Sequence, residues 1–207
     1  MSAHEGAAPA TEPADSTSTG DEATAGSDIP DDRSTGAGSR GAHRVLIAAA
    51  AVVTALPFVS ALIAWNEGWT PTSDWASVVI RAYDTFSAHP PLVGIYSSAT
   101  TSAESTRTVY HPGPLQEWLL AGPTHLFAPS TVGVLLGSAL LVSAAILTVL
   151  VVAHRRGRRR GLAAGTVAVG AYLLATGPTM LYAPLHTVLA TYAMIAFLAS
   201  VWAVLDH

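Results

Sequence analysis

Long apolar runs separated by polar segments predict that this chain is built from helices that cross a membrane. The first run, 45–65, contains no charged side chain. At a rise of about 1.5 Å per residue, a helix of this length spans the roughly 30 Å hydrocarbon core of a bilayer. Further uncharged runs cover 131–153, 161–177 and 185–205. The pattern therefore predicts an all-α polytopic membrane protein with four transmembrane helices.

The segment 66–130, between the first two runs, has helical periodicity in its first part. Five apolar side chains of the stretch 73–87 fall on one helical face: Trp75, Val78, Val79, Ala82 and Phe86. A second, short helix is expected over 114–121, where Gly122 and Pro123 should end it. We expect both helices to be amphipathic and to lie in the membrane interface, joined by a loop made rigid by proline and glycine.

Composition agrees with a membrane protein. Half of the residues are hydrophobic and 12% are charged, about half the charged fraction of an ordinary soluble domain. The net charge of −4 arises near the N-terminus, because most of the acids precede residue 42. Residues 1–43 have almost no large apolar side chains, so we predict a disordered acidic tail there and a membrane domain over 44–207.

Arginine placement predicts the orientation in the cell membrane. The loop 154–160 carries five arginines, and positively charged loops stay on the cytoplasmic side. The N-terminal tail is then also cytoplasmic, and 66–130 forms an external loop. The arginine loop also suits contact with anionic lipid headgroups. We interpret it as a topology signal, and we expect no nucleic-acid partner.

Two absent residue types narrow the chemistry. The chain has no cysteine and no lysine, which excludes a thiolate nucleophile, a cysteine-ligated metal, Schiff-base chemistry and a P-loop. The four runs carry no charge, which argues against an ion pump and disfavours a small permease subunit. Candidate functional residues therefore lie in the external loop: Asp74, Arg81, Asp84, Arg107, Tyr110 and His111.

The external loop also carries a family resemblance. An early acid in an amphipathic helix is followed by HPPLVGIYSS at 89–98 and VYHPGPLQEWLLAGPTHLF at 109–127. This order resembles the N-terminal part of GT-C superfamily membrane glycosyltransferases, as found in large multi-spanning proteins of high-GC Gram-positive bacteria. Stretches at 182–184 and 197–203 extend the resemblance, which covers about 44–207.

The resemblance implies transfer of a sugar from a polyprenyl-phosphate donor to an extracytoplasmic glycan or lipid acceptor. Asp74 is then the catalytic general base that deprotonates the acceptor hydroxyl. Arg81, Arg107 and a protonated His111 would bind the donor phosphate, with Tyr110 as a further substrate-binding residue.

Two open choices concern the remaining acid and arginine of the first amphipathic helix. Asp84 either assists Asp74 or holds a divalent cation together with it, although many members of the superfamily need no metal. Arg81 and Asp84, three residues apart, alternatively form an intrahelical ion pair of small energy.

Members of the family carry around ten or more transmembrane helices. We therefore expect this chain to be the N-terminal portion of such a protein, or a shorter protein that works with further membrane subunits. The alternative function is a non-catalytic membrane scaffold or accessory protein, whose external loop serves as a docking surface.

Overall fold

The computed structural model describes residues 33–96, 110, 111 and 113–205. Its helices are α1 Arg33–Asn66, α2 Asp74–Asp84, α3 Leu115–Leu126, α4 Val132–Thr176, the 3₁₀ helix η2 Pro178–Leu181, and α5 His186–Leu205. Extended pairing within the described ranges is limited to one bridge between Tyr96 and Tyr110. The all-α prediction is confirmed for this part of the chain. Three helices, α1 from Arg40, α4 and α5, are long and apolar enough to cross a membrane.

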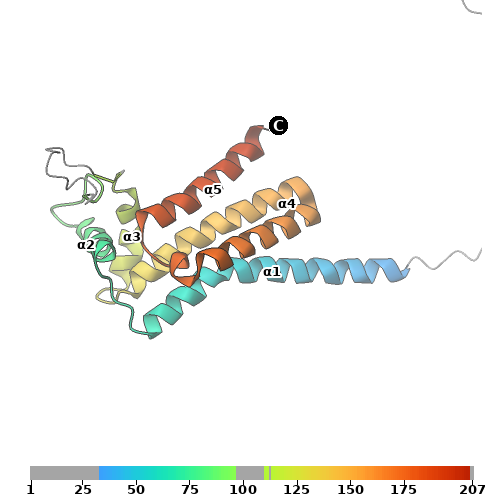
Figure 1. Cartoon of the computed structure of the whole chain (residues 1–207), viewed down its shortest axis with the longest axis horizontal. Coiled ribbons are helices and arrows are strands. Elements are labelled where there is room, and N and C mark those ends of the chain that lie inside the picture. The colour runs from blue at the N-terminus through green and yellow to red at the C-terminus, as the bar shows by residue number, and fades with distance from the viewer. Residues whose placement is uncertain (1–32, 97–109, 112, 206–207) are drawn as a thin grey trace, which may run out of the picture.

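The helix α4 is a hairpin of two arms. Its backbone leaves the helical region at Arg158, with φ 49° and ψ −130°, a conformation uncommon outside glycine. Figure 1 shows the chain doubling back there. A Cβ on Gly161 would lie 2.0 Å from the carbonyl oxygen of Ala153, so only glycine lets the arms approach this closely. Because the chain reverses at the single residue Arg158, most of the segment 154–160, which we predicted to be a loop, is helical.

The helix α1 continues through Pro57 and is bent (Figure 1). Proline lacks an N–H and weakens the helical hydrogen bonding of the preceding turn. The hydroxyl of Ser143 on α4 donates to the carbonyl oxygen of Thr54 at 2.8 Å. This hydrogen bond joins α1 to α4 close to the bend.

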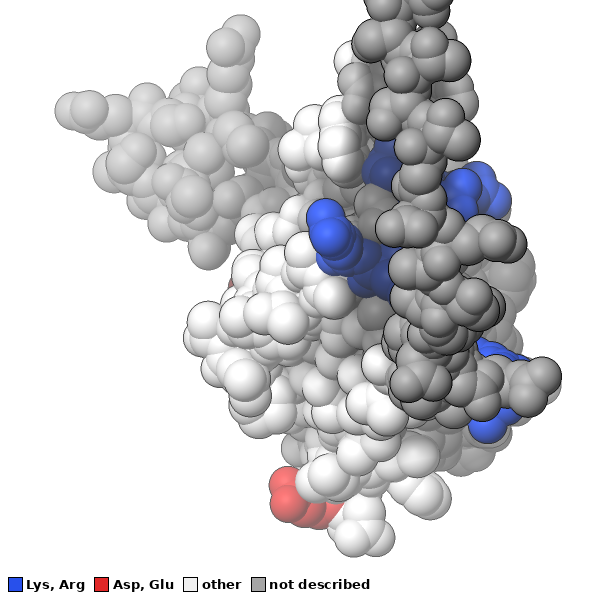
Figure 2. Space-filling view, turned by 90° about the vertical axis from the view of Figure 1, so that its right-hand side faces the viewer, with Lys and Arg blue, Asp and Glu red and all other residues white. Residues whose placement is uncertain are grey.

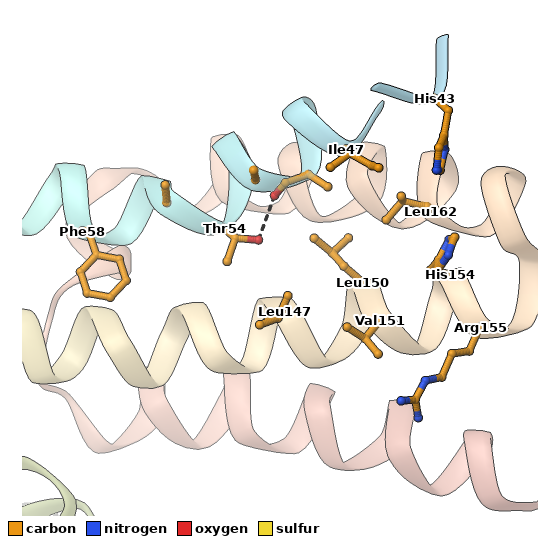
Figure 3. Close-up of a pocket in the computed structure, with 13 residues that line it drawn as sticks. His43, Ile47, Thr54, Phe58, Leu147, Leu150, Val151, His154, Arg155 and Leu162 are labelled. Carbon is orange, nitrogen blue, oxygen red and sulfur yellow. Dashed lines mark hydrogen bonds between the residues drawn. The ribbon is translucent and has the colours of Figure 1, made fainter. Parts of the chain in front are cut away.

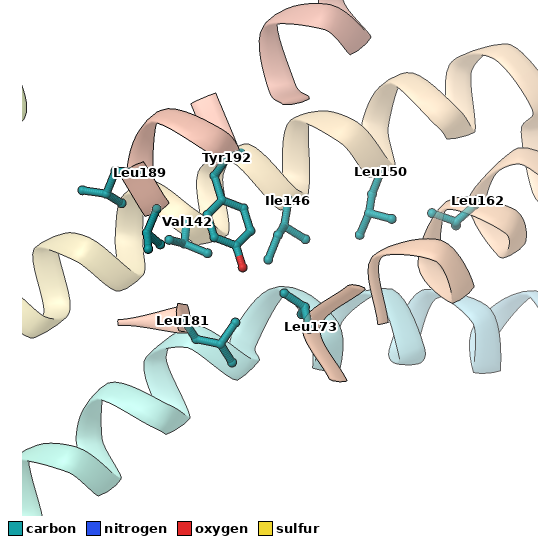
Figure 4. Packing of buried hydrophobic residues seen from close by; sticks show 10 residues of the cluster. Val142, Ile146, Leu150, Leu162, Leu173, Leu181, Leu189 and Tyr192 are labelled. Atoms are coloured by element: carbon teal, nitrogen blue, oxygen red, sulfur yellow. The ribbon is translucent and has the colours of Figure 1, made fainter. Parts of the chain in front are cut away.

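The apolar core lies around the two arms of α4. Figure 4 shows Val142 and Ile146 of the first arm near Leu173 of the second, with Tyr192 of α5 beside them. Both α1 and α5 keep most of their apolar surface uncovered, as at Val45 and Phe197, which are 70% and 61% exposed. Apolar surface of this extent is unfavourable in water and favourable against lipid.

The predicted end of the helix after residue 121 is wrong. The helix α3 runs through Gly122 and Pro123 to Leu126. Its last turns pack against the start of α4, where a Cβ on Gly133 would lie 2.3 Å from the carbonyl oxygen of Pro123. This close packing holds the turn in place despite the missing proline N–H.

The helix α1 begins at Arg33, inside the tail predicted over 1–43. A helix nucleated in the apolar run extends toward the N-terminus without a new nucleation cost. The rest of the predicted tail, 1–32, lies outside the described residues.

The close approach at Gly161 gives a stability prediction. Gly161→Ala should destabilise the chain by about 2 kcal/mol, since its Cβ would overlap a backbone oxygen and force the arms apart. The measurement is thermal unfolding of the purified chain in detergent. The matched control is Gly157→Ala, because a Cβ at Gly157 meets no atom within 4 Å. Equal stability of the two variants would contradict the packing described for α4.

Candidate functional site

A fully buried carboxylate, Glu117 of α3, is the centre of the candidate site. Its side chain has 0% exposure, and a charged group is almost never buried this completely unless it is paired. The Nε2 atom of His186, at the start of α5, lies 3.1 Å from the Oε1 atom of Glu117. The Nε atom of Arg81 on α2 lies 3.7 Å from the same oxygen. Three helices therefore meet at one carboxylate.

Apolar packing between α2 and α3 brings the charges together. Leu120 follows Glu117 by three residues and lies on the same face of α3. It packs against Val78 and Ala82 of α2. These residues belong to the apolar face that we expected to lie in the membrane interface. Part of that face packs against protein, whereas Phe86 stays 65% exposed. Because Arg81 follows Val78 by three residues, the two lie on the same side of α2, and the Arg81 side chain reaches Glu117.

The loop between α2 and α3 adds a second imidazole. The Arg81 guanidinium donates to the carbonyl oxygen of Val93, and the backbone N–H of His111 donates to the carbonyl oxygen of Ile95 at 2.8 Å. A Cβ on Gly94 would lie 1.8 Å from the carbonyl oxygen of His111, so glycine is required for this approach. The His111 ring then stacks on His186, with centroids 5.4 Å apart and planes 7° apart.

The surroundings of Glu117 favour its charged form. Burial raises the pKa of the carboxyl, but the hydrogen bond from His186, a backbone hydrogen bond and the charges of His186 and Arg81 outweigh it. The pKa of Glu117 therefore lies below its ordinary value. The Oε2 atom of Glu117 is buried and has no hydrogen-bond partner among the described residues.

An apolar cleft adjoins the cluster. It has a volume of about 290 Å³ and begins at His186. Its other lining residues come from the segment just before α3, from α3 itself, from α4 and from α5: Gly113, Leu115, Gln116, Leu119, Leu141, Leu189, Ala190 and Ala193. A polar centre and an apolar cleft thus share one histidine.

The structure places two of the predicted site residues, Arg81 and His111, at this cluster. Asp74 begins α2 and is exposed, outside the contacts around Glu117. Tyr110 is exposed, and its ring lies edge-on to Tyr96 at 6.2 Å. Arg107 lies outside the described residues.

The suggested cation site of Asp74 and Asp84 is not supported. The two acids are the first and last residues of α2, about 15 Å apart along its axis, so they cannot share one ion. Among the residues that the structure describes, no three metal-ligating side chains come together. Arg81 pairs with Glu117 rather than with Asp84.

The sequence interpretation missed Glu117 and His186. Neither residue is among the candidates named from the sequence. One available signal was the position of Glu117, three residues before Leu120 within the apolar stretch 115–121.

Comparisons with known proteins do not assign the chain to a family. Protein-family models, curated proteins and solved structures all give no match to it.

The lowered pKa of Glu117 predicts acid-sensitive stability. A carboxyl with a depressed folded-state pKa contributes stability that is complete above its ordinary value of 4.5 and lost as the pH falls through the depressed value. Thermal unfolding in detergent should therefore show a loss of stability below pH 4.5. Glu117→Gln should lower stability by about 3 kcal/mol at neutral pH and remove much of the acid-dependent loss.

The control is Asp84→Asn, because Asp84 is exposed. This variant should leave the stability at neutral pH and the acid-dependent loss of stability nearly unchanged. An acid profile of Glu117→Gln that coincides with that of the unmodified chain would contradict the assignment of this loss to Glu117.

Proposed function

We propose that the chain crosses the membrane four times, through α1, the two arms of α4, and α5. At 1.5 Å per residue the arms 132–157 and 159–176 are about 39 Å and 27 Å long, close to the 30 Å hydrocarbon core. Under the positive-inside rule the α4 turn with its arginines is cytoplasmic. The Glu117 cluster, at the other end of the helices, then lies at the external membrane surface.

We propose further that the protein, as it stands or as part of a larger assembly, transfers a sugar from a polyprenyl-phosphate donor to an external acceptor. The observation that carries this proposal is the junction of the buried Glu117 cluster with the apolar cleft at His186. A donor with a charged head and an isoprenoid tail has both chemistries. Its tail would lie along α5, and its phosphate would meet His111, His186 and Arg81.

Asp74 keeps the role of general base that the family resemblance implies. Its exposure leaves the carboxylate accessible to an acceptor hydroxyl. It lies seven residues before Arg81 on α2, about 10 Å along the axis. A sugar held at the cluster would place its acceptor near this acid. Glu117 would then orient His186 and keep the phosphate-binding groups in position.

A second candidate function is a non-catalytic scaffold or accessory subunit. It is favoured by the contacts of Glu117 itself, which join α2, α3 and α5 and so have a structural use without any reaction. The exposed apolar faces of α1 and α5 would suit helices of further membrane subunits. Sugar transfer that depends on Asp74 separates the two functions.

The decisive variant is Asp74→Asn. General base catalysis contributes about 10²- to 10⁴-fold to a rate, so sugar transfer should fall by at least about 100-fold while thermal stability stays unchanged. The measurement is incorporation of radiolabelled sugar into external glycan, in membranes of a deletion strain that expresses the unmodified or the variant chain.

The matched control is Asp84→Asn, which removes an equally exposed acid from the other end of α2 and should keep full transfer. Unchanged transfer by Asp74→Asn would exclude Asp74 as the base. Glycan synthesis that is the same with and without the unmodified chain would exclude the sugar-transfer proposal.

A further inference from the structure

We propose that an anionic phospholipid binds in a groove between α1 and the first arm of α4, far from the Glu117 cluster. One acyl chain would lie along the groove, and the phosphate would sit at its mouth among His43, His154 and Arg155. This site is independent of the proposed sugar transfer.

The groove is apolar and deep enough for an acyl chain. Its volume is about 640 Å³, and Figure 3 shows it running between α1 and α4 from His43 and His154 toward Phe58. His43 and Phe58 are fifteen residues apart on α1, about 22 Å along the axis. One leaflet of the hydrocarbon core is about 15 Å thick. The groove therefore covers the full depth that an acyl chain occupies.

Small residues on α1 keep the groove open. Ala50, Ala51 and Ala55 line it from one side, opposite Leu147 and Val151 of α4. Alanine leaves space where a larger side chain would fill the gap between the helices. An unfilled apolar groove that faces lipid in a membrane will take up an apolar chain, because empty space there forfeits dispersion contacts.

The mouth of the groove is basic. A second hollow of about 680 Å³ shares His43, His154 and Arg155 with the groove and continues over Arg158 and the residues beside it. The rings of His43 and His154 stack with centroids 6.5 Å apart. The Nδ1 atom of His43 is buried and has no hydrogen-bond partner among the described residues.

Charge complementarity selects an anionic lipid. Figure 2 looks onto this end of the molecule and shows arginine side chains gathered on it. The acids among residues with described side chains, Glu67, Asp74, Asp84 and Glu117, belong to the opposite end. An arginine at the membrane surface attracts an anionic headgroup more strongly than a neutral one, so Arg155 at the mouth of the groove favours an anionic lipid.

One arginine of the turn has a different task. Arg156 donates to backbone carbonyl oxygens of Trp202 and Ala203, and its guanidinium lies 5.7 Å from the Trp202 ring centroid. It holds the end of α5 against the turn. Arg155, which lines both the groove and its mouth, is the arginine best placed for the phosphate.

The test is lipid retention by the purified full chain in detergent, measured by native mass spectrometry with phosphatidylglycerol and phosphatidylcholine in equal amounts. The unmodified chain should retain phosphatidylglycerol preferentially. Arg155→Gln should lower retention of phosphatidylglycerol about fivefold and leave that of phosphatidylcholine unchanged. Ala51→Trp should lower retention of both lipids, because it fills the groove.

Two controls are matched to these variants. Arg44→Gln removes an exposed arginine of α1 that does not line the groove, and Ala48→Trp adds the same bulk to α1 outside it; both should behave like the unmodified chain. Soluble glycerol phosphate in excess should not displace the lipid, because it lacks the acyl chain. Equal retention of the two lipids by the unmodified chain would overturn the proposal. Loss of phosphatidylglycerol with Arg44→Gln as large as with Arg155→Gln would overturn it as well.

Discussion

The arrangement of the helices above the bundle depends on one buried charge. Removing a carboxylate from water costs several kcal/mol unless opposite charges and hydrogen bonds replace the lost hydration. Glu117 meets this requirement with Arg81 from α2 and His186 from α5. These two partners belong to helices far apart in the sequence, so the pairing of Glu117 joins distant segments. Because the His111 ring stacks on His186, the same pairing also holds the loop that carries His111.

The bundle beneath is held by close approach of small residues and by shared hydrogen bonds. Glycines lie at two tight contacts, Gly161 in the turn of α4 and Gly133 beside Pro123. The hydroxyl of Ser143 on α4 donates to a carbonyl oxygen of α1 close to its bend. Such contacts are effective in a lipid environment, where apolar burial alone contributes little to helix association. The two ends of the bundle differ in charge, with a paired acid at one and arginines at the other.

Hydrophobic pattern alone predicted much of this architecture. Uncharged runs of about twenty residues located α1, α5 and both arms of α4, because the length and polarity of a run are local properties. The periodicity of 73–87 likewise located α2, which is observed as Asp74–Asp84. The predicted helix ends were wrong where packing overrides the local preference of the sequence. At Pro123, for example, α3 continues because it packs closely beside Gly133 of α4.

The candidate site was harder to predict because it is built by long-range contacts. Arg81 and His111 were named from their types and positions, and both lie at the cluster. Glu117 and His186 are 69 residues apart, and nothing local to either residue indicates the pairing. Periodicity placed Val78 and Ala82 on one apolar face of α2, but it could not show that Leu120 of α3, rather than lipid, packs against them.

The most direct measurement is a double-mutant cycle between Arg81 and Glu117. The free energy of unfolding in detergent at neutral pH is compared for Arg81→Gln, Glu117→Gln, the double variant and the unmodified chain. Pairing of a buried carboxylate predicts that the double variant is more stable than the sum of the single effects by about 1 to 3 kcal/mol. Effects that add to within about 0.5 kcal/mol would contradict it, because the two side chains would then not depend on each other.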